Sequence, residues 1–296
     1  MSEKVSFFDA ISTNKRNSLI LIFLLSLIFM GAVLALSYLY FYDLGICGPI
    51  IGFFALLFYA TVVYFAGDKV ILAVSGAKKA EKKDYPFLYN VVEGLALASG
   101  IPMPALYVVN DPSPNAFATG RDPQHASLAV TTGLLQMLKR EELEGVVAHE
   151  ISHIGNYDIR FMMIAIVFAG AIGMIAELGM RLTWFGGRDR DRKGGGALAV
   201  LALLFMILAP IFAYLVRMAI SREREYLADA NGAKLTRYPE GLASALEKIS
   251  GAAIPMQTAS ETTASLYISN PFPKKMSFFL STHPDPGDRI KRLRAM

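Results

Sequence analysis

The sequence of 296 residues contains 29 Lys and Arg against 25 Asp and Glu, and its formal net charge is +4. Its hydrophobic fraction of 54% and charged fraction of 18% depart from the roughly 45–50% and about 25% of ordinary soluble domains. The small net charge, with basic residues beside apolar blocks, is not typical of a nucleic-acid-binding protein. The single cysteine, Cys47, excludes an intramolecular disulfide.

Four apolar blocks predict four transmembrane helices, because about 20 apolar residues of helix span a bilayer. The first block, Ser18–Tyr42, holds no charge and is longer than the apolar region of a signal peptide, so we interpret it as a retained anchor. It forms a first hairpin with the second block, and the third and fourth blocks form a second hairpin. These three further blocks are Gly45–Ala66, Phe161–Met180 and Ala197–Val216.

Basic residues gather at both ends of the first hairpin, with Lys4, Lys15 and Arg16 before it and five lysines between Lys69 and Lys83 after it. The positive-inside rule therefore predicts that the soluble parts of the chain face the cytoplasm. The arginine-rich loop of residues 181–193 would then lie on the outer side. The second hairpin either crosses the membrane despite these charges or enters it without crossing fully.

Residues 68–160 have the composition of a soluble segment. Pro86–Ala98 is expected to be a helix with proline in its first turn and Gly100 just beyond its end. A longer helix is expected from about Arg140, and it can continue without a break into the third block. After the fourth block, residues 217–248 are expected to be largely helical, and a last helix begins near Asp285. Short apolar runs predict three strands, at Ala105–Val109, Asn115–Thr119 and Ser127–Thr131.

The sequence His149-Glu150-Ile151-Ser152-His153 is an HExxH motif. Histidines four residues apart lie on one face of a helix, so both imidazoles can bind a single metal ion. Glu150 is placed to take a proton from a zinc-bound water. The motif therefore predicts one catalytic zinc ion per chain.

A catalytic zinc site needs a third protein ligand, and a second predicted helix offers two carboxylates. Glu225 and Asp229 are again four residues apart, so one can bind the metal while the other supports a ligand histidine. Asp229 is our candidate for the supporting position, on His149. The alternative is that residues 222–225 form a solvated charge cluster beside a membrane span.

These motifs resemble those of the HtpX family of membrane-bound zinc metalloproteases and, more distantly, of the CAAX prenyl proteases. The resemblance covers essentially the whole chain, and its matching pieces are His149–His153, Ser221–Asp229, Asn115–Phe117 and Thr282–Pro284. It implies that Glu225 is the third zinc ligand, and that the substrates are misfolded or damaged membrane proteins under quality control.

The expected fold class is mainly α with a small β-sheet (α+β). Four transmembrane helices form two hairpins, residues 1–67 and 161–216, and accompany a zincin-type HExxH metalloprotease domain. The first part of that domain is residues 68–160, with the edge strand and the HExxH helix. The second part is residues 217–296, with the third zinc ligand and the C-terminal helix.

Two further groups are candidates for contact with substrate. Asn115, Ala116 and Phe117 are expected on an edge strand that an extended substrate can join through its backbone, the alternative being an ordinary strand with a buried Phe117. His283 is a candidate donor to the oxyanion of the reaction, the alternative being a surface histidine. Arg289 can act likewise or pair with a carboxylate.

The motifs and this resemblance together predict a zinc-dependent endopeptidase, in which Glu150 is the general base and self-cleavage is expected. The resemblance implies a multi-pass protein of a prokaryotic cytoplasmic (inner) membrane. Its partners are polypeptide substrates, mostly membrane proteins, and the lipid bilayer; no nucleic acid is expected. Two alternatives remain open at this point: a prenyl-protein (CAAX-type) protease, and a non-catalytic membrane adaptor with a structural zinc.

Overall fold

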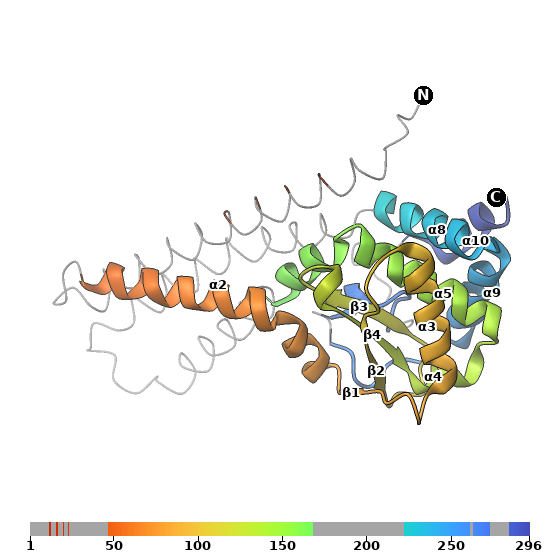
Figure 1. Cartoon of the computed structure of the whole chain (residues 1–296), viewed down its shortest axis with the longest axis horizontal. Coiled ribbons are helices and arrows are strands. Elements are labelled where there is room, and N and C mark those ends of the chain that lie inside the picture. The colour runs from red at the N-terminus through yellow and green to blue at the C-terminus, as the bar shows by residue number, and fades with distance from the viewer. Residues whose placement is uncertain are drawn as a thin grey trace, which may run out of the picture.

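The computed structural model describes residues 47–167, 222–260, 263–272 and 284–296, together with the single positions 12, 16, 20 and 23 (Figure 1). Outside the described residues lie the first predicted span apart from residues 20 and 23, the fourth span, most of the third span, and His283.

The second predicted span is a helix, α2, which comprises the 28 residues Cys47–Val74. It projects away from the body of the protein (Figure 1), and Phe53, Phe54 and Phe58 are among its exposed apolar side chains. Within the described residues it is the one helix long and apolar enough to cross a membrane. The last turns of α2 contact the body of the protein, and there Ile71 and Leu72 are buried.

The body contains a four-stranded mixed sheet in the order β1-β2-β4-β3, so β3 is an edge strand. β1 pairs antiparallel with β2, β2 parallel with β4, and β4 antiparallel with β3. The three predicted strands are confirmed to within one residue at each end, whereas the short β1 was not predicted. The strands are β1 (Ala77–Lys79), β2 (Ala105–Val109), β3 (Ala116–Gly120) and β4 (Ala126–Thr131).

Helix α3 begins at the residue that its sequence predicts and ends within one residue of the predicted position. Pro86 opens α3 and Gly100, with φ of 72°, closes it, because proline suits the first turn and glycine the left-handed position after the last. The helices are α3 (Pro86–Ser99), α4 (Thr132–Met137), α5 (Arg140–Gly155), α8 (Arg222–Thr236), α9 (Pro239–Ala252) and α10 (Pro286–Leu293), with short 3-10 turns η2 (Pro123–His125) and η3 (Ala264–Leu266).

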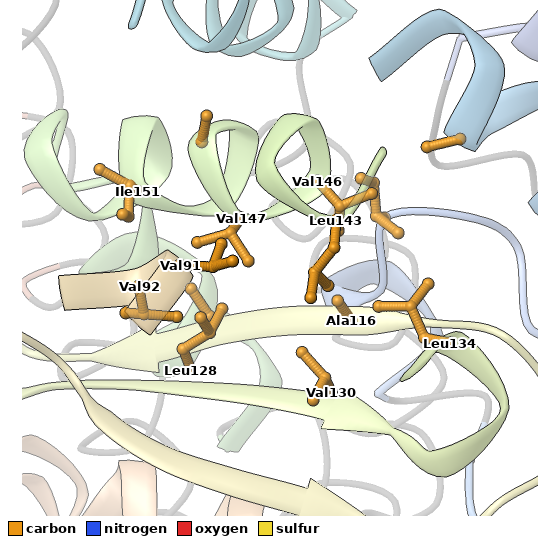
Figure 2. Close-up of a cluster of buried hydrophobic side chains, with 14 of the residues drawn as sticks. Val91, Val92, Ala116, Leu128, Val130, Leu134, Leu143, Val146, Val147 and Ile151 are labelled. Atoms are coloured by element: carbon orange, nitrogen blue, oxygen red, sulfur yellow. The ribbon is translucent and has the colours of Figure 1, made fainter. Parts of the chain in front are cut away.

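Two apolar clusters hold this body together, one on each face of the sheet, because alternate residues of a strand point to opposite faces. On one face, side chains of α3 and α5 meet Leu128 and Val130 of β4 (Figure 2). On the other face, Phe117 and Ala129 pack with residues of α2 and of the helical segment 158–167. The sheet therefore lies between the HExxH helix α5 and the base of the membrane-type helix α2.

The expectation that the HExxH helix can continue unbroken into the third span is wrong. Helix α5 ends at Gly155, residues 156 and 157 form a turn, and a helix resumes at residue 158. Tyr157 has a φ of 61°, a left-handed conformation that interrupts a helix and is uncommon outside glycine. The turn brings Asp158 back toward the HExxH motif.

Candidate metal centre

The two histidines of the HExxH motif lie on one face of α5, as their spacing predicts. His149 and His153 are 1% and 7% exposed, and their rings meet edge to face with centroids 4.7 Å apart. Their Nε2 atoms are 3.1 Å apart. Both imidazoles therefore direct the same ring nitrogen toward one point inside the protein.

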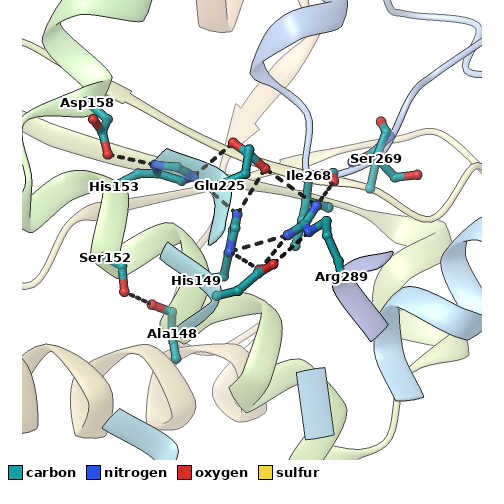
Figure 3. Close-up of polar contacts among 11 residues, drawn as sticks. Ala148, His149, Ser152, His153, Asp158, Glu225, Ile268, Ser269 and Arg289 are labelled. Atoms are coloured by element: carbon teal, nitrogen blue, oxygen red, sulfur yellow. Dashed lines mark hydrogen bonds and ion pairs between the residues drawn. The ribbon is translucent and has the colours of Figure 1, made fainter. Parts of the chain in front are cut away.

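Helix α8 supplies the carboxylate that faces this point (Figure 3). Glu225 Oε1 lies 3.4 Å from His153 Nε2, and Oε2 lies 3.8 Å from His149 Nε2. Asp229, one turn later on the same helix face, instead contacts His149 Nδ1 at 2.9 Å. Gly232 continues this face, and a Cβ there would lie only 3.0 Å from the His149 backbone nitrogen. The absent side chain lets α8 approach α5 closely.

His149, His153 and Glu225 fit a metal ion in both geometry and chemistry. One ligand atom from each residue lies within 4.8 Å of the others. Tetrahedral zinc with bonds of about 2.0–2.1 Å would separate adjacent ligand atoms by about 3.3 Å, close to the separations found here. Because each Nδ1 faces a carboxylate, it carries the ring proton, and each Nε2 offers its lone pair to the centre.

Two carboxylates beside His153 favour a cation at this ring, whereas burial lowers the pKa of His149. Burial tends to lower the pKa of His153, but hydrogen bonds with the carboxylates of Asp158 and Glu225 raise it well above its usual value. The field that favours a proton on this ring also favours a metal ion between the three groups.

An arginine from the C-terminal helix supports the first histidine through Asp229. Arg289 donates to Asp229 through Nε at 2.9 Å and Nη2 at 2.7 Å. Burial by itself would raise the pKa of the Asp229 carboxyl, but the charge of Arg289 and the hydrogen bonds from His149 and Arg289 lower it to about 2. Asp229 therefore remains a carboxylate and can accept the His149 Nδ1 proton. Of the two roles suggested for Arg289, the structure shows pairing with a carboxylate.

The second histidine has an equivalent support that was missed from the sequence. Asp158 Oδ2 lies 2.9 Å from His153 Nδ1, and Asp158 Oδ1 lies 3.8 Å from Arg224 Nε. The sequence did offer an indication of this support. Asp158 lies five residues after His153, just beyond Gly155 and Asn156, where a helix is expected to end. Each histidine thus contacts an aspartate, and each aspartate faces an arginine, which is buried in the case of Arg289 and partly exposed in the case of Arg224.

Glu150 lies on the same helix, 2% exposed. Burial raises the pKa of its carboxyl to about 7. The charges of His153 and Arg289 and a hydrogen bond from the Ala118 backbone N–H act in the opposite direction and lower this pKa. A carboxyl with this pKa can both accept and return a proton near neutral pH.

The predicted edge-strand residues lie beside the centre but already have partners in the chain. Asn115 Nδ2 donates to the Ser269 carbonyl at 3.0 Å, and Ser269 N–H donates to Asn115 Oδ1 at 3.3 Å. The Ala116 carbonyl accepts from Ile268 N–H at 3.0 Å. Phe117 is buried, with its ring 5.1 Å from that of Tyr267. The segment Tyr267–Ser269 therefore borders β3 at its Asn115 end.

The paired histidine helix and carboxylate helix, with a mixed sheet beneath them, define a metalloprotease. The sequence model of Peptidase family M48 matches residues 83–296, and the chain belongs to this family. It is 49% identical over 292 residues to "Protease HtpX homolog" of Dictyoglomus thermophilum, covering 98% of this chain and 95% of the relative. It is 44% identical to the protein of that name from Caldanaerobacter subterraneus subsp. tengcongensis, covering 99% of both chains.

A solved structure shares the fold. The crystal structure of S. mikatae Ste24p matches with a TM-score of 0.52 and 18% sequence identity, over 95% of this chain and 65% of that chain. The chain thus spans about two thirds of the length of Ste24p. The predicted resemblance to the HtpX family is confirmed, and the protein is a membrane metalloprotease. The alternative of a non-catalytic adaptor is therefore wrong.

Proposed function

We propose that the protein is a zinc-dependent endopeptidase whose metal is held by His149, His153 and Glu225. The observation that carries this proposal is the convergence of two Nε2 atoms and a carboxylate, with each Nδ1 occupied by an aspartate. Imidazole and carboxylate ligands with three protein donors are typical of catalytic zinc. When bound, zinc supplies Lewis-acid polarisation of the scissile carbonyl and makes water more acidic.

Glu150 is proposed as the general base and acid. Its carboxylate takes a proton from the attacking water and later returns it to the leaving amine. The buried setting that raises its pKa to about 7 suits both halves of this task. Glu150 directly follows the ligand His149 in the sequence, which places its carboxylate close to the centre for this transfer.

The substrate is proposed to pair with β3 as an added strand. Successive residues of an antiparallel strand direct their backbone groups to opposite sides. Asn115 accepts from Thr131 N–H on the β4 side, so the backbone groups of Ala116 and Ala118 face away from β4. Since Ile268 already donates to Ala116, pairing begins at the carbonyl of Ala118. Asn115, Ala116 and Phe117 then serve the substrate indirectly, by holding the segment Tyr267–Ser269 at the end of the paired stretch.

His283 is proposed as a donor to the developing oxyanion. The support for this role is its place in the sequence, just before α10, which brings Arg289 to the centre.

The remaining predictions concern the membrane. Helix α2 supports the first hairpin, and we propose four spans in two hairpins around a cytoplasmic active site in a prokaryotic inner membrane. Misfolded or damaged membrane proteins are the proposed substrates, because an enzyme that reads backbone at a strand edge makes little demand on sequence.

Glu150→Gln tests the proposal directly. The variant should hold zinc at the wild-type ratio, since no ligand is changed, and should lose cleavage of unfolded casein by a factor of about 10² or more. Glu144→Gln, on the exposed face of the same helix and paired with Arg140, is the matched control and should cleave normally. Wild-type protein that binds no zinc, or a Glu150→Gln variant that cleaves at the wild-type rate, would refute the assignment.

Self-cleavage is a second expected readout. Residues 253–255 follow α9, have no regular structure and are exposed, which makes them a favourable site for proteolysis. Wild-type protein incubated with zinc should give fragments beginning near Ala253, while the Glu150→Gln variant stays intact. N-terminal sequencing locates the cut. Wild-type protein that remains whole while it degrades casein would contradict self-cleavage and leave the metal site untouched.

A further inference from the structure

Asp158 occupies a position that the proposed chemistry does not use directly. Its side chain is 2% exposed, although burial of a carboxylate is costly without partners. The partners are His153 Nδ1 at 2.9 Å and Arg224 Nε at 3.8 Å. The carboxylate of Asp158 thus contacts the Nδ1 edge of the His153 ring, while Nε2 of the same ring is directed to the metal centre.

The two aspartates that support the histidines belong to different parts of the fold. Asp229 lies within α8 and is fixed by Arg289 from α10, so its position depends on the packing of the body. Asp158 instead begins the helical segment 158–167. Residues 161–166 of that segment are buried in the cluster that contains Val63, Ile71 and Leu72 of α2, whereas Ile159 packs in the cluster that contains residues of α5.

The contact between this segment and α2 is close. A Cβ at Gly67 would lie 3.2 Å from both Cγ and Sδ of Met163, and Met163 is fully buried. Gly67 lies within the stretch of α2 that is able to cross a membrane. A side chain added at Gly67 would therefore press on Met163 of the segment that carries Asp158.

We propose that Asp158 is a positioning residue for His153, and that it makes zinc retention depend on the packing of the segment 158–167 against the membrane helix α2. This inference rests on the proposed zinc site. A hydrogen bond of 2.9 Å is lost with a displacement of less than 1 Å, and the imidazole then loses both its fixed tautomer and its ring orientation. The membrane helix and the metal centre are thus joined through one carboxylate.

The first test measures the zinc dissociation constant of the full-length protein in detergent against a competing chelator. Asp158→Ala should bind zinc about 10–100-fold more weakly than wild type. Asp158→Asn should recover part of the loss, because the amide oxygen still accepts the Nδ1 proton. Unchanged affinity in Asp158→Ala, with wild-type affinity intact, overturns the proposal; absence of zinc binding by wild type would instead refute the proposed site itself.

Asp111→Asn provides the matched control for loss of a buried carboxylate. Asp111 is 1% exposed and accepts hydrogen bonds from the backbone of Ser113, Gln257 and Thr258, so these bonds involve neither histidine. This variant should lower the thermal midpoint and keep the wild-type zinc affinity. If it weakened zinc as much as Asp158→Ala does, general destabilisation would explain both variants and the specific role would fail.

The second test addresses the link to α2 without altering the centre. Gly67→Val should push Met163 away and weaken zinc several-fold. Gly94→Val, in α3 with open space around its position, should leave zinc affinity unchanged. Circular dichroism confirms that both proteins are folded. Folded Gly67→Val with wild-type zinc affinity overturns the link between α2 and the centre.

Discussion

Arg289 and Asp229 form a two-pronged ion pair, with Nε–Oδ2 and Nη2–Oδ1 separations of 2.9 and 2.7 Å. Both residues are 2% exposed, and the same guanidinium donates through Nη1 to the Ile268 carbonyl at 3.0 Å. One side chain of α10 therefore joins the support of His149 to the segment that borders β3. The C-terminal helix is part of the architecture of the metal centre.

Arg289→Lys should not replace arginine, because an ammonium group cannot make two parallel bonds to a carboxylate and also reach Ile268. Asp229 would lose its fixed orientation, and zinc affinity should fall about 10-fold or more. Chelator competition measures the change. Arg294→Lys is the control, since Arg294 pairs with Glu240 and Glu247 on the surface; a variant of Arg289 that behaves like this control would remove Arg289 from the centre.

Gly232→Ala should separate α8 from α5. Its new methyl group would meet the backbone of His149 at 3.0 Å, and overpacking against backbone costs about 1–3 kcal/mol. Both the thermal midpoint and the zinc affinity should fall, because Glu225 and Asp229 move with the helix. Gly251→Ala, which has open space in α9, should be neutral or slightly stabilising. Equal behaviour of the two variants would contradict close helix contact at the centre.

Asn115→Ala should impair cleavage while sparing the metal. The change removes the side-chain bonds to both backbone groups of Ser269, so the segment that borders β3 loses one anchor. We expect a higher KM for peptide substrates with a zinc content equal to that of wild type. A normal KM would show that this end of β3 has no part in substrate binding.

Glu142 is expected to make stability depend on pH. Burial by itself would raise the pKa of its carboxyl, but hydrogen bonds from Lys248, the Lys139 backbone and Ser244 lower it below the ordinary value of 4.5. A lowered pKa in the folded state contributes stability above the unfolded value, and this contribution is lost as pH falls through the folded value. Glu142→Gln should therefore cost about 1–3 kcal/mol at neutral pH.

Unfolding midpoints of wild type and Glu142→Gln, measured between pH 7 and pH 3, check this expectation. The difference between the two proteins should shrink as the pH falls below 4.5. A difference that stays constant across this range would show that the ionised form of Glu142 adds nothing to stability.

Local patterns in the sequence determined the catalytic motif and most of the body. Residues four apart share a helix face whatever the surroundings, so His149 and His153 had to converge. Short apolar runs predicted three strands of the sheet, and the length of an apolar block predicted helix α2. The lysine-rich strand β1 was not predicted, because an exposed edge strand of three residues contains no apolar run.

The tertiary structure decided which groups surround the histidines. The spacing of Glu225 and Asp229 left either one free to face the metal, and only the docking of α8 on α5 directs Glu225 to the two Nε2 atoms and Asp229 to Nδ1. Asp158 and Arg289 reach the centre through a turn and a distant helix. Such contacts depend on long-range packing, which the periodicity of a single segment does not encode.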